Sequence, residues 1–293
     1  MTRLLLLLLA SLAAGPAFAL NILLTNDDGW QAPGIQSVYK TLTAAGHTVT
    51  LVAPVSDQSG RGGAMNTDVG GYVAVNRVGD SMWSVDGTPT DSVRAGLQVI
   101  LRDAPPDIVI SGSNFGQNLG RAGAHQSGTV NAALQSAFLG YPAIAISVGI
   151  RFDEFDAKPH RFPSTIATFG PTAKLLVAML EQLHQASPER LLPPGLALNV
   201  NVPAGWQPGR GLRLAPLSSA SHVDMHWRVG ERPFGEDGGE LLIDAVVGGH
   251  GQAGDDAHLF DLGYATVTPI DGSADTWVPV PGLAGALDYR PDN

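Results

Sequence analysis

The chain has 293 residues, of which 44% are hydrophobic and 15% charged, a composition typical of a globular protein with a substantial buried core. Its net charge is −10 and no segment is basic enough to hold a phosphate backbone, which excludes polymeric nucleic acid as a partner. The chain contains no cysteine, so its stability comes from its core and not from disulfides.

Residues 1–19 have the pattern of a secretory signal peptide. Arg3 precedes an unbroken run of leucines from Leu4 to Leu9, and Ala17-Phe18-Ala19 offers the small residues of a cleavage site. The apolar run is too short for a permanent membrane anchor, although an N-terminal anchor or a helix of the fold is the alternative. We therefore expect cleavage after Ala19 and export, most simply to a bacterial periplasm.

A strand, a helix and a second strand follow. Residues 20–25 form an apolar run that Gly29 ends, and residues 47–54 form another run typical of a strand. Between them, apolar residues recur with helical spacing after Pro33, at Ile35, Val38, Tyr39 and Leu42. This is a βαβ unit, in which the two strands run parallel.

The next part of the chain continues the alternation of strands and helices. We expect a hairpin over residues 72–86, a helix beginning at Thr88-Pro89, and a short strand over residues 107–111. A glycine-rich loop from Gly112 to Gly128 precedes another helix. A strand over 141–148, a helix over 163–185 and a strand over 196–202 complete an α/β pattern with a mostly parallel sheet flanked by helices.

Residues 204–260 differ in amino-acid composition from the rest of the chain. They are rich in glycine, proline and charge, with short strand candidates around residues 212–217 and 240–247, so we expect an extended arm or β-hairpin and not a second core. Residues 264–269 alternate as a returning strand would. An isolated two-stranded arm is marginal in water, so we expect this arm to pack on a second copy of the chain.

Oxygen-bearing side chains follow the ends of three predicted strands. Asp27 and Asp28 follow the first strand, Ser59 lies in the loop after the second, and Asn114 lies three residues beyond the strand over 107–111. The carboxyl ends of parallel strands form the ligand-binding edge of an open sheet. Adjacent buried carboxylates repel each other unless a cation lies between them, and oxygen ligands suit Mg²⁺, Mn²⁺ or Ca²⁺ but not zinc. We predict a metal site with the ligands Asp27, Asp28, Ser59 and Asn114; for the two aspartates alone, a turn and helix cap is the alternative.

Ser127-Gly128-Thr129 opens the helix after the glycine-rich loop. The free N–H groups and the positive end of the helix dipole form an anion site there, to which the two hydroxyls could also donate. Ser127 as an ordinary N-cap is the alternative. We predict that Ser127, Gly128 and Thr129 bind a phosphate, and that Asn114 takes part in this binding.

These segments, taken in order, resemble the SurE family of stationary-phase survival proteins, which are metal-dependent 5′/3′-nucleotidases. The matching motifs run from residue 21 to about 270, so that residues 20–293 resemble one SurE-like domain. They are Ile22-Leu-Leu-Thr-Asn-Asp-Asp-Gly29 with Ala32-Pro-Gly-Ile35; Val52-Ala-Pro54 with Ser59-Gly60; Gly87-Thr-Pro-Thr-Asp91; Ser111-Gly-Ser-Asn114 with Gly116, Asn118 and Gly120; Ser127-Gly-Thr-Val130; and Gly263-Tyr264 with Val267-Thr-Pro269.

The resemblance implies a Rossmann-like core, a C-terminal arm swapped between subunits, and a homodimer or a tetramer. It also implies hydrolysis of nucleoside 5′- or 3′-monophosphates and other phosphomonoesters with one divalent cation per subunit. The family's metal ligands carry over to Asp27, Asp28, Ser59 and Asn114, and its anion-binding segment to Ser127, Gly128 and Thr129. The metal would activate a water, and one of the two aspartates, preferably Asp27, would accept its proton.

The sequence departs from the family pattern beside the phosphate segment. Gln126 stands where the family usually has an aromatic residue, and Asn131 stands where a glycine is common. His125 and His258 are the histidines best placed to contact a leaving group. A haloacid-dehalogenase-type phosphatase would need Asp-x-Asp and is excluded because Gly29 occupies the second position; a non-catalytic metal-binding or nucleotide-binding protein is the competing interpretation.

Overall fold

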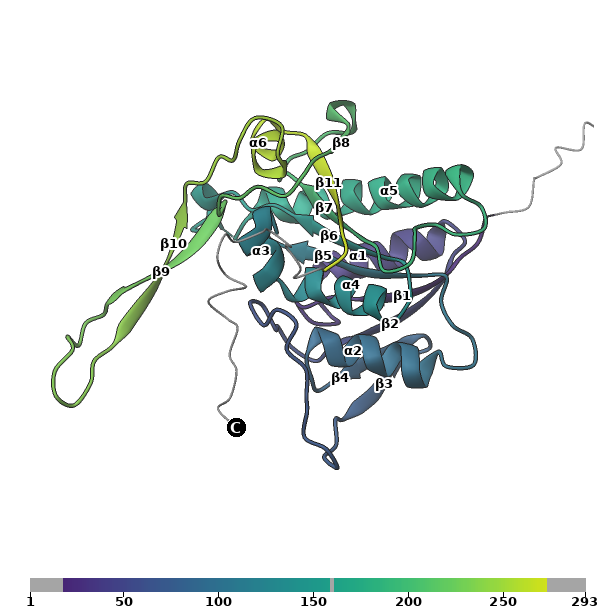
Figure 1. Ribbon diagram of the computed structural model, residues 1–293, viewed down its shortest axis with the longest axis horizontal. Helices are drawn as coiled ribbons and strands as arrows, with labels where there is room; N and C mark the ends of the chain where they lie inside the picture. Colours follow the sequence, from purple (N-terminus) through teal and green to yellow (C-terminus); the bar gives the residue numbers. More distant parts are fainter. Residues whose placement is uncertain (1–17, 159–160, 273–293) are drawn as a thin grey trace, which may run out of the picture.

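A mostly parallel sheet with helices on both faces forms the body of the protein (Figure 1). The computed structural model describes residues 18–158 and 161–272. Within these residues the sheet has nine strands in the order β3-β4-β2-β1-β5-β6-β7-β11-β8, and only the β3–β4 and β7–β11 pairs are antiparallel. The strands are β1 (Asn21–Thr25), β2 (Thr48–Pro54), β3 (Val75–Gly79), β4 (Met82–Val85), β5 (Ile108–Phe115), β6 (Ala143–Val148), β7 (Ala197–Val202), β8 (Leu212–Leu214) and β11 (Ala265–Ile270).

Alternate side chains of the central strands supply two cores. In β1, Ile22 and Leu24 pack with α1 (Pro33–Ala44) and α5 (Pro163–Ala186), whereas Leu23 packs on the opposite face with α2 (Pro89–Ala95) and α4 (Gly128–Phe138). Because β1 is buried on both faces, it reads as a continuous apolar run. The predicted α/β architecture is confirmed, including the hairpin β3–β4. The smaller elements are the π turn η1 (Gly96–Ile100), α3 (Gly120–Gln126), the 3₁₀ turns η2 (Phe152–Glu154) and η3 (Pro208–Arg210), and α6 (Asp256–Asp261).

The predicted boundary of the fifth strand was wrong. β5 does not stop at Ser111 but continues to Phe115, because it keeps pairing with β6 across a register shift between Gly112 and Asn114. Asn114 therefore lies on the strand itself and not in the loop beyond it. The predicted loop is also shorter, since α3 occupies part of it.

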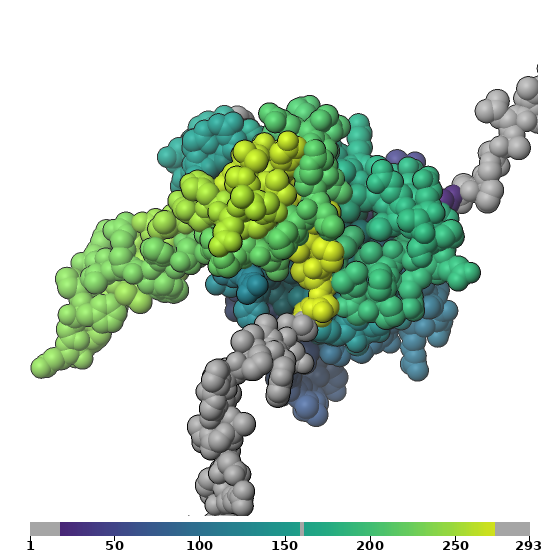
Figure 2. Space-filling view, turned by 45° about the horizontal axis from the view of Figure 1, so that its top comes forward, coloured from purple at the N-terminus to yellow at the C-terminus, as the bar shows by residue number. Residues whose placement is uncertain are grey.

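The predicted arm is present but narrower than residues 204–260. It is the antiparallel hairpin of β9 (Val223–Val229) and β10 (Leu241–Val247), which projects away from the body (Figures 1 and 2). β8 instead pairs with β11, and α6 packs beside β11, so both belong to the body. The strand candidate at residues 212–217 contains β8, but the sequence does not show that β8 pairs with β11, and α6 is too short to show a helical period.

One face of the hairpin is entirely apolar. The cross-strand pairs Leu241–Val229, Ile243–Trp227, Ala245–Met225 and Val247–Val223 share that face, while the other face carries Arg228, His226, Asp224 and Asp244. Trp227 is 62% and Ile243 55% exposed in the single chain. Side chains of this size are normally covered in a soluble protein, so this face is suited to a contact with another molecule.

The predicted signal peptide lies outside the described residues, apart from Phe18 and Ala19. The last segment, residues 273–293, lies outside them as well. None of the helices within residues 18–158 and 161–272 combines the length and the apolar character needed to cross a bilayer.

Candidate functional site

The turn after β1 holds the two adjacent aspartates at the carboxyl edge of the sheet. Gly29 has φ of +98°, a conformation that suits glycine, and Asn26 Nδ2 donates to its carbonyl oxygen at 3.0 Å. Asp27 is 3% exposed, and its carbonyl oxygen accepts from the Gln58 amide at 2.7 Å. The loop after β2 is thereby fastened to the loop after β1, as the sheet topology predicted.

Both carboxyl groups are held in unfavourable surroundings for a negative charge. Burial, and after it the charge of Asp27, raises the pKa of Asp28 to about 8. Burial also raises the pKa of Asp27, against the opposing effect of hydrogen bonds from Thr129, whose hydroxyl donates to Asp27 Oδ1. The Phe115 amide donates to Asp28 Oδ2 at 3.0 Å. These neutral donors offset only part of the cost of burying two carboxylates side by side.

Asp57 is a third carboxylate in this region, and the sequence argument missed it. Its charge raises the pKa of both Asp27 and Asp28. Asp57 Oδ1 accepts from the amide and from the hydroxyl of Ser59, at 2.8 and 2.6 Å. Because the Ser59 hydroxyl hydrogen is engaged in this way, the lone pairs of its oxygen are left for a cation.

Asn114 and Ser127 complete the polar side of the site. Asn114 Nδ2 donates to the Gly116 carbonyl at 2.8 Å, which leaves Oδ1 as the free ligand atom. Ser127 caps α4, and its hydroxyl accepts from the Val130 amide at 3.1 Å. The N-cap interpretation of Ser127 is therefore correct, and it leaves the anion-binding role open.

Gly128 lets the start of α4 approach Asp27 closely. A Cβ at this position would lie 2.8 Å from both Cβ and Oδ2 of Asp27, so only glycine fits here. The positive end of the helix dipole thus faces the buried carboxylate. Asn131 supports the same junction, since its side-chain amide donates to the carbonyl oxygens of Ser127 at 2.8 Å and His125 at 2.9 Å.

A cavity of about 250 Å³ lies over these residues. Asp27, Ser59, Asn114 and Ser127 are among the polar residues that line it, and five large apolar side chains line it as well. The apolar residues are Phe115, Ile150, Phe152, Val223 and Met225.

Asp28 lines a second hollow beside this cavity, together with Asp57, Phe115 and Phe169. Phe115 lines both spaces.

The donors in this region fit a hard divalent cation. They are carboxylate, hydroxyl and amide oxygens, and neither hollow is lined by a lysine, arginine or histidine of the described residues. Within the described part of the chain, His, Cys, Asp and Glu side chains nowhere form a group of three suited to a metal by themselves. A cation here would thus depend on Ser59 and Asn114 as well as on the aspartates.

The comparisons with known proteins agree with this geometry. The family model "Survival protein SurE" matches residues 22–224. The chain belongs to the SurE family. A protein from Nitratidesulfovibrio vulgaris named 5′-nucleotidase SurE is 36% identical over 254 residues, covering 86% of this chain and 93% of that protein. A protein of the same name from Xanthomonas campestris pv. campestris is 35% identical over 282 residues, covering 92% and 99%.

A solved structure supports the same conclusion for the fold. The crystal structure of the SurE protein from Aquifex aeolicus has a TM-score of 0.71 and 27% identity, and it covers 90% of this chain and 97% of that chain. The SurE resemblance stated from the sequence is therefore confirmed.

The two histidines singled out from the sequence of this SurE-family chain do not line the cavity. His125 is exposed on α3, and His258 lies on α6. His222 contacts a residue of the cavity: its Nδ1 lies 3.4 Å from Gln117, which lines the cavity, and its Nε2 lies 2.9 Å from Asp261. No spacing pattern in the sequence pointed to His222, because its partners come from two distant segments.

Replacing Thr129 with valine tests the contact between α4 and Asp27. Thr129 is fully buried, and valine keeps its shape but removes the hydroxyl that donates to Asp27. A hydrogen bond to a charged group contributes about 1.5–3 kcal/mol, so we expect kcat/KM to fall about 10- to 100-fold, with weaker binding of a divalent cation. Steady-state kinetics and metal titration measure this, and Thr129→Ser, which keeps the hydroxyl, is the matched control. Unchanged kinetics and metal affinity in Thr129→Val would contradict the assignment.

Proposed function

We propose that this protein is a divalent-metal-dependent phosphomonoesterase that hydrolyses nucleoside 5′- or 3′-monophosphates to a nucleoside and phosphate. The observation that carries the proposal is the pair of adjacent aspartates at the carboxyl edge of the sheet, Asp27 buried and Asp28 half-buried, beside a helix N-terminus and without a basic partner lining the site. Two relatives named 5′-nucleotidase SurE, similar over most of their length, support it.

Each residue of the site would have a distinct task. Asp27 and Asp28 would hold the cation, with Ser59 Oγ and Asn114 Oδ1 as the neutral ligands. When bound, a divalent cation would neutralise charge on the phosphoryl oxygens and lower the pKa of a water. Asp27, which lines the cavity, would accept the proton of the attacking water, and the hydroxyl of Thr129, which donates to Asp27 Oδ1, would hold this carboxylate in position.

The phosphate would lie against the start of α4. Ser127 lines the cavity there, and the positive end of the helix dipole favours an anion. The Asn114 side chain borders the same space and could contact both the cation and the phosphate. Gly128 contributes by its lack of a side chain, which keeps this anion site next to Asp27.

Phosphate release tests the proposal directly. The purified protein is incubated with a panel of nucleoside 5′- and 3′-monophosphates, with Mn²⁺ or Mg²⁺ and, in parallel, with EDTA. Release that requires the cation supports a metal-dependent phosphatase. Nucleotide or metal binding without any release would establish the competing interpretation, a non-catalytic binding protein, and full activity in EDTA would rule out the metal.

The stability of the metal-free protein should depend on pH through Asp28. The pKa of this carboxyl is about 8 in the folded protein, well above its value in the unfolded chain, so between about pH 4 and pH 8 the folded state binds more protons. Metal-free stability should therefore fall as the pH rises through this window. Since a cation needs the deprotonated carboxylates, Mn²⁺ should raise Tm more at about pH 8 than at about pH 5.5. Thermal unfolding with Mn²⁺ or EDTA measures both effects, and a metal-free Tm that does not change with pH would contradict them.

We further propose that the subunits associate through the hairpin β9–β10 as a homodimer or as a tetramer of two dimers. The uncovered apolar face of the hairpin supports this, because exchange of identical arms buries such a face symmetrically.

We propose, finally, that residues 1–19 act as a signal peptide and that the mature protein is periplasmic. The arginine, the leucine run and the Ala17-Phe18-Ala19 site support this. Cell fractionation and an N-terminal sequence that begins at Leu20 would test it.

A further inference from the structure

The segment after β6 carries none of the motifs discussed so far, yet it forms one wall of the cavity. This segment contains Ile150 and the turn η2, and both Ile150 and Phe152 line the same cavity as Asp27 and Ser127. β6, the neighbour of β5 in the sheet, thus delivers a further group at the carboxyl edge.

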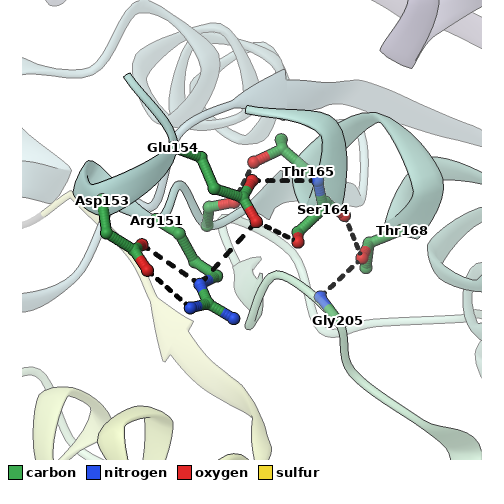
Figure 3. Close-up of polar contacts among 8 residues, drawn as sticks. Arg151, Asp153, Glu154, Ser164, Thr165, Thr168 and Gly205 are labelled. Carbon is green, nitrogen blue, oxygen red and sulfur yellow. Dashed lines mark hydrogen bonds and ion pairs between the residues drawn. The ribbon is translucent and has the colours of Figure 1, made fainter. Parts of the chain in front are cut away.

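Polar contacts fix the shape of this segment (Figure 3). The Glu154 carboxylate accepts from the Ser164 amide at 3.0 Å and from the Ser164 hydroxyl, which ties η2 to the start of α5. Arg151 forms an ion pair with Asp153 at 2.6 Å and lies 3.8 Å from Glu154. Phe152 stands between these anchored residues, so the position of its ring is defined by the backbone around it.

The start of the segment is anchored as well. The Ile150 amide donates to Gln117 Oε1 at 2.9 Å, and the Gly149 carbonyl accepts from the Thr165 hydroxyl at 2.7 Å. Gln117 itself lines the cavity. The wall that carries Phe152 is therefore connected to β5 on one side and to α5 on the other.

The ring of Phe152 is available to a ligand. Phe115, the other aromatic residue of the wall, is already packed against Phe162 and Phe169, each at 5.8 Å between ring centroids. Phe152 makes no aromatic contact with any residue that the structure describes, and it is only half-buried. A cavity lined both by an aromatic ring and by polar groups suits a substrate with an aromatic end and a charged end.

We propose that Phe152 is a specificity-determining residue whose ring stacks on the nucleobase of a nucleoside monophosphate, with Met225 and Ile150 bordering the same space. The inference rests on the proposed function, since it takes the phosphate to lie at Asp27 and Ser127. In this proposal, the segment after β6 is the part of the protein that distinguishes nucleotides from phosphomonoesters that lack a base.

The experiment compares AMP with ribose 5-phosphate, which keeps the phosphate and the sugar but has no base. Phe152→Ala should raise KM for AMP about tenfold, with kcat nearly unchanged, because stacking is uniform binding that persists in the transition state. KM for ribose 5-phosphate should change less than about twofold. Phe152→Trp should restore the low KM for AMP, since it restores an aromatic surface.

Phe155→Ala is the matched control. It removes an equal ring from the same segment, but Phe155 packs on Phe162 and beneath the Arg161 guanidinium and does not line the cavity. Its kinetics with both substrates should match those of the unmodified protein.

The outcomes separate the two proposals. If the unmodified protein hydrolyses both substrates and Phe152→Ala leaves KM for AMP unchanged, or raises both KM values equally, the nucleobase subsite is overturned and the phosphatase stands. If the unmodified protein releases phosphate from neither substrate with Mn²⁺, the proposed function fails, and the subsite fails with it.

Discussion

Replacing Asp28 with asparagine should abolish divalent-cation binding and lower phosphate release by a factor of about 10³ or more. The substitution removes one of the two carboxylates of the proposed cation site, and the remaining donors near it are neutral apart from Asp27 and the exposed Asp57. Isothermal titration with Mn²⁺ and a phosphate-release assay measure the two effects.

The stability of the same variant distinguishes a lost ligand from a damaged fold. Asp28 is half-buried beside Asp27, whose charge raises its pKa, so neutralising Asp28 relieves a repulsion, and the metal-free Tm at about pH 8 should rise rather than fall. Asp103→Asn is the control, because Asp103 is an exposed carboxylate away from both hollows. Near-normal hydrolysis by Asp28→Asn would end the metal assignment.

The second large effect concerns the arm. Charged substitutions of the cross-strand pair Trp227 and Ile243, as Trp227→Glu with Ile243→Lys, should convert the protein to monomers at micromolar concentration. Burying a large apolar side chain contributes about 1.5–3 kcal/mol, so losing two such side chains from the proposed interface should weaken association by about two orders of magnitude or more.

Deletion of residues 222–252, which contain the hairpin, should give monomers or insoluble protein. Sedimentation velocity measures the oligomeric state.

The other face of the hairpin provides the control for this experiment. His226 and Asp244 form a cross-strand pair on that face, and replacing both with serine should leave the oligomeric state unchanged. An unmodified protein that sediments as a monomer at micromolar concentration would refute the arm-mediated assembly.

Strand and helix periodicity predicted the body of the fold, because the central strands are buried on both faces and the helices on one. The boundary of β5 was missed for a physical reason. Gly112-Ser-Asn114 has the composition of a turn, and only the pairing with β6 keeps this segment extended. α6 was missed because its six residues are too few to show a helical period.

The site was predictable where a strand end coincides with a distinctive polar residue. Asp27, Ser59, Asn114 and Ser127 border one cavity in the structure, while Asp28 borders the hollow beside it. Phe152 gave no such signal, because a phenylalanine in a loop is an ordinary apolar residue until the fold places it in the lining of the cavity that contains Asp27. The direct contact between Thr129 and Asp27 likewise joins residues that are 102 positions apart.

The root of the arm has a consequence for enzymology. Val223 and Met225 belong both to β9 and to the wall of the cavity, so the segment that would seat on a neighbouring subunit also shapes the space for the substrate. Dilution separates associated subunits by mass action, and this separation would loosen the wall of the cavity. The turnover number per chain would therefore depend on the protein concentration. Cellular abundance would in this way set how efficiently each molecule works.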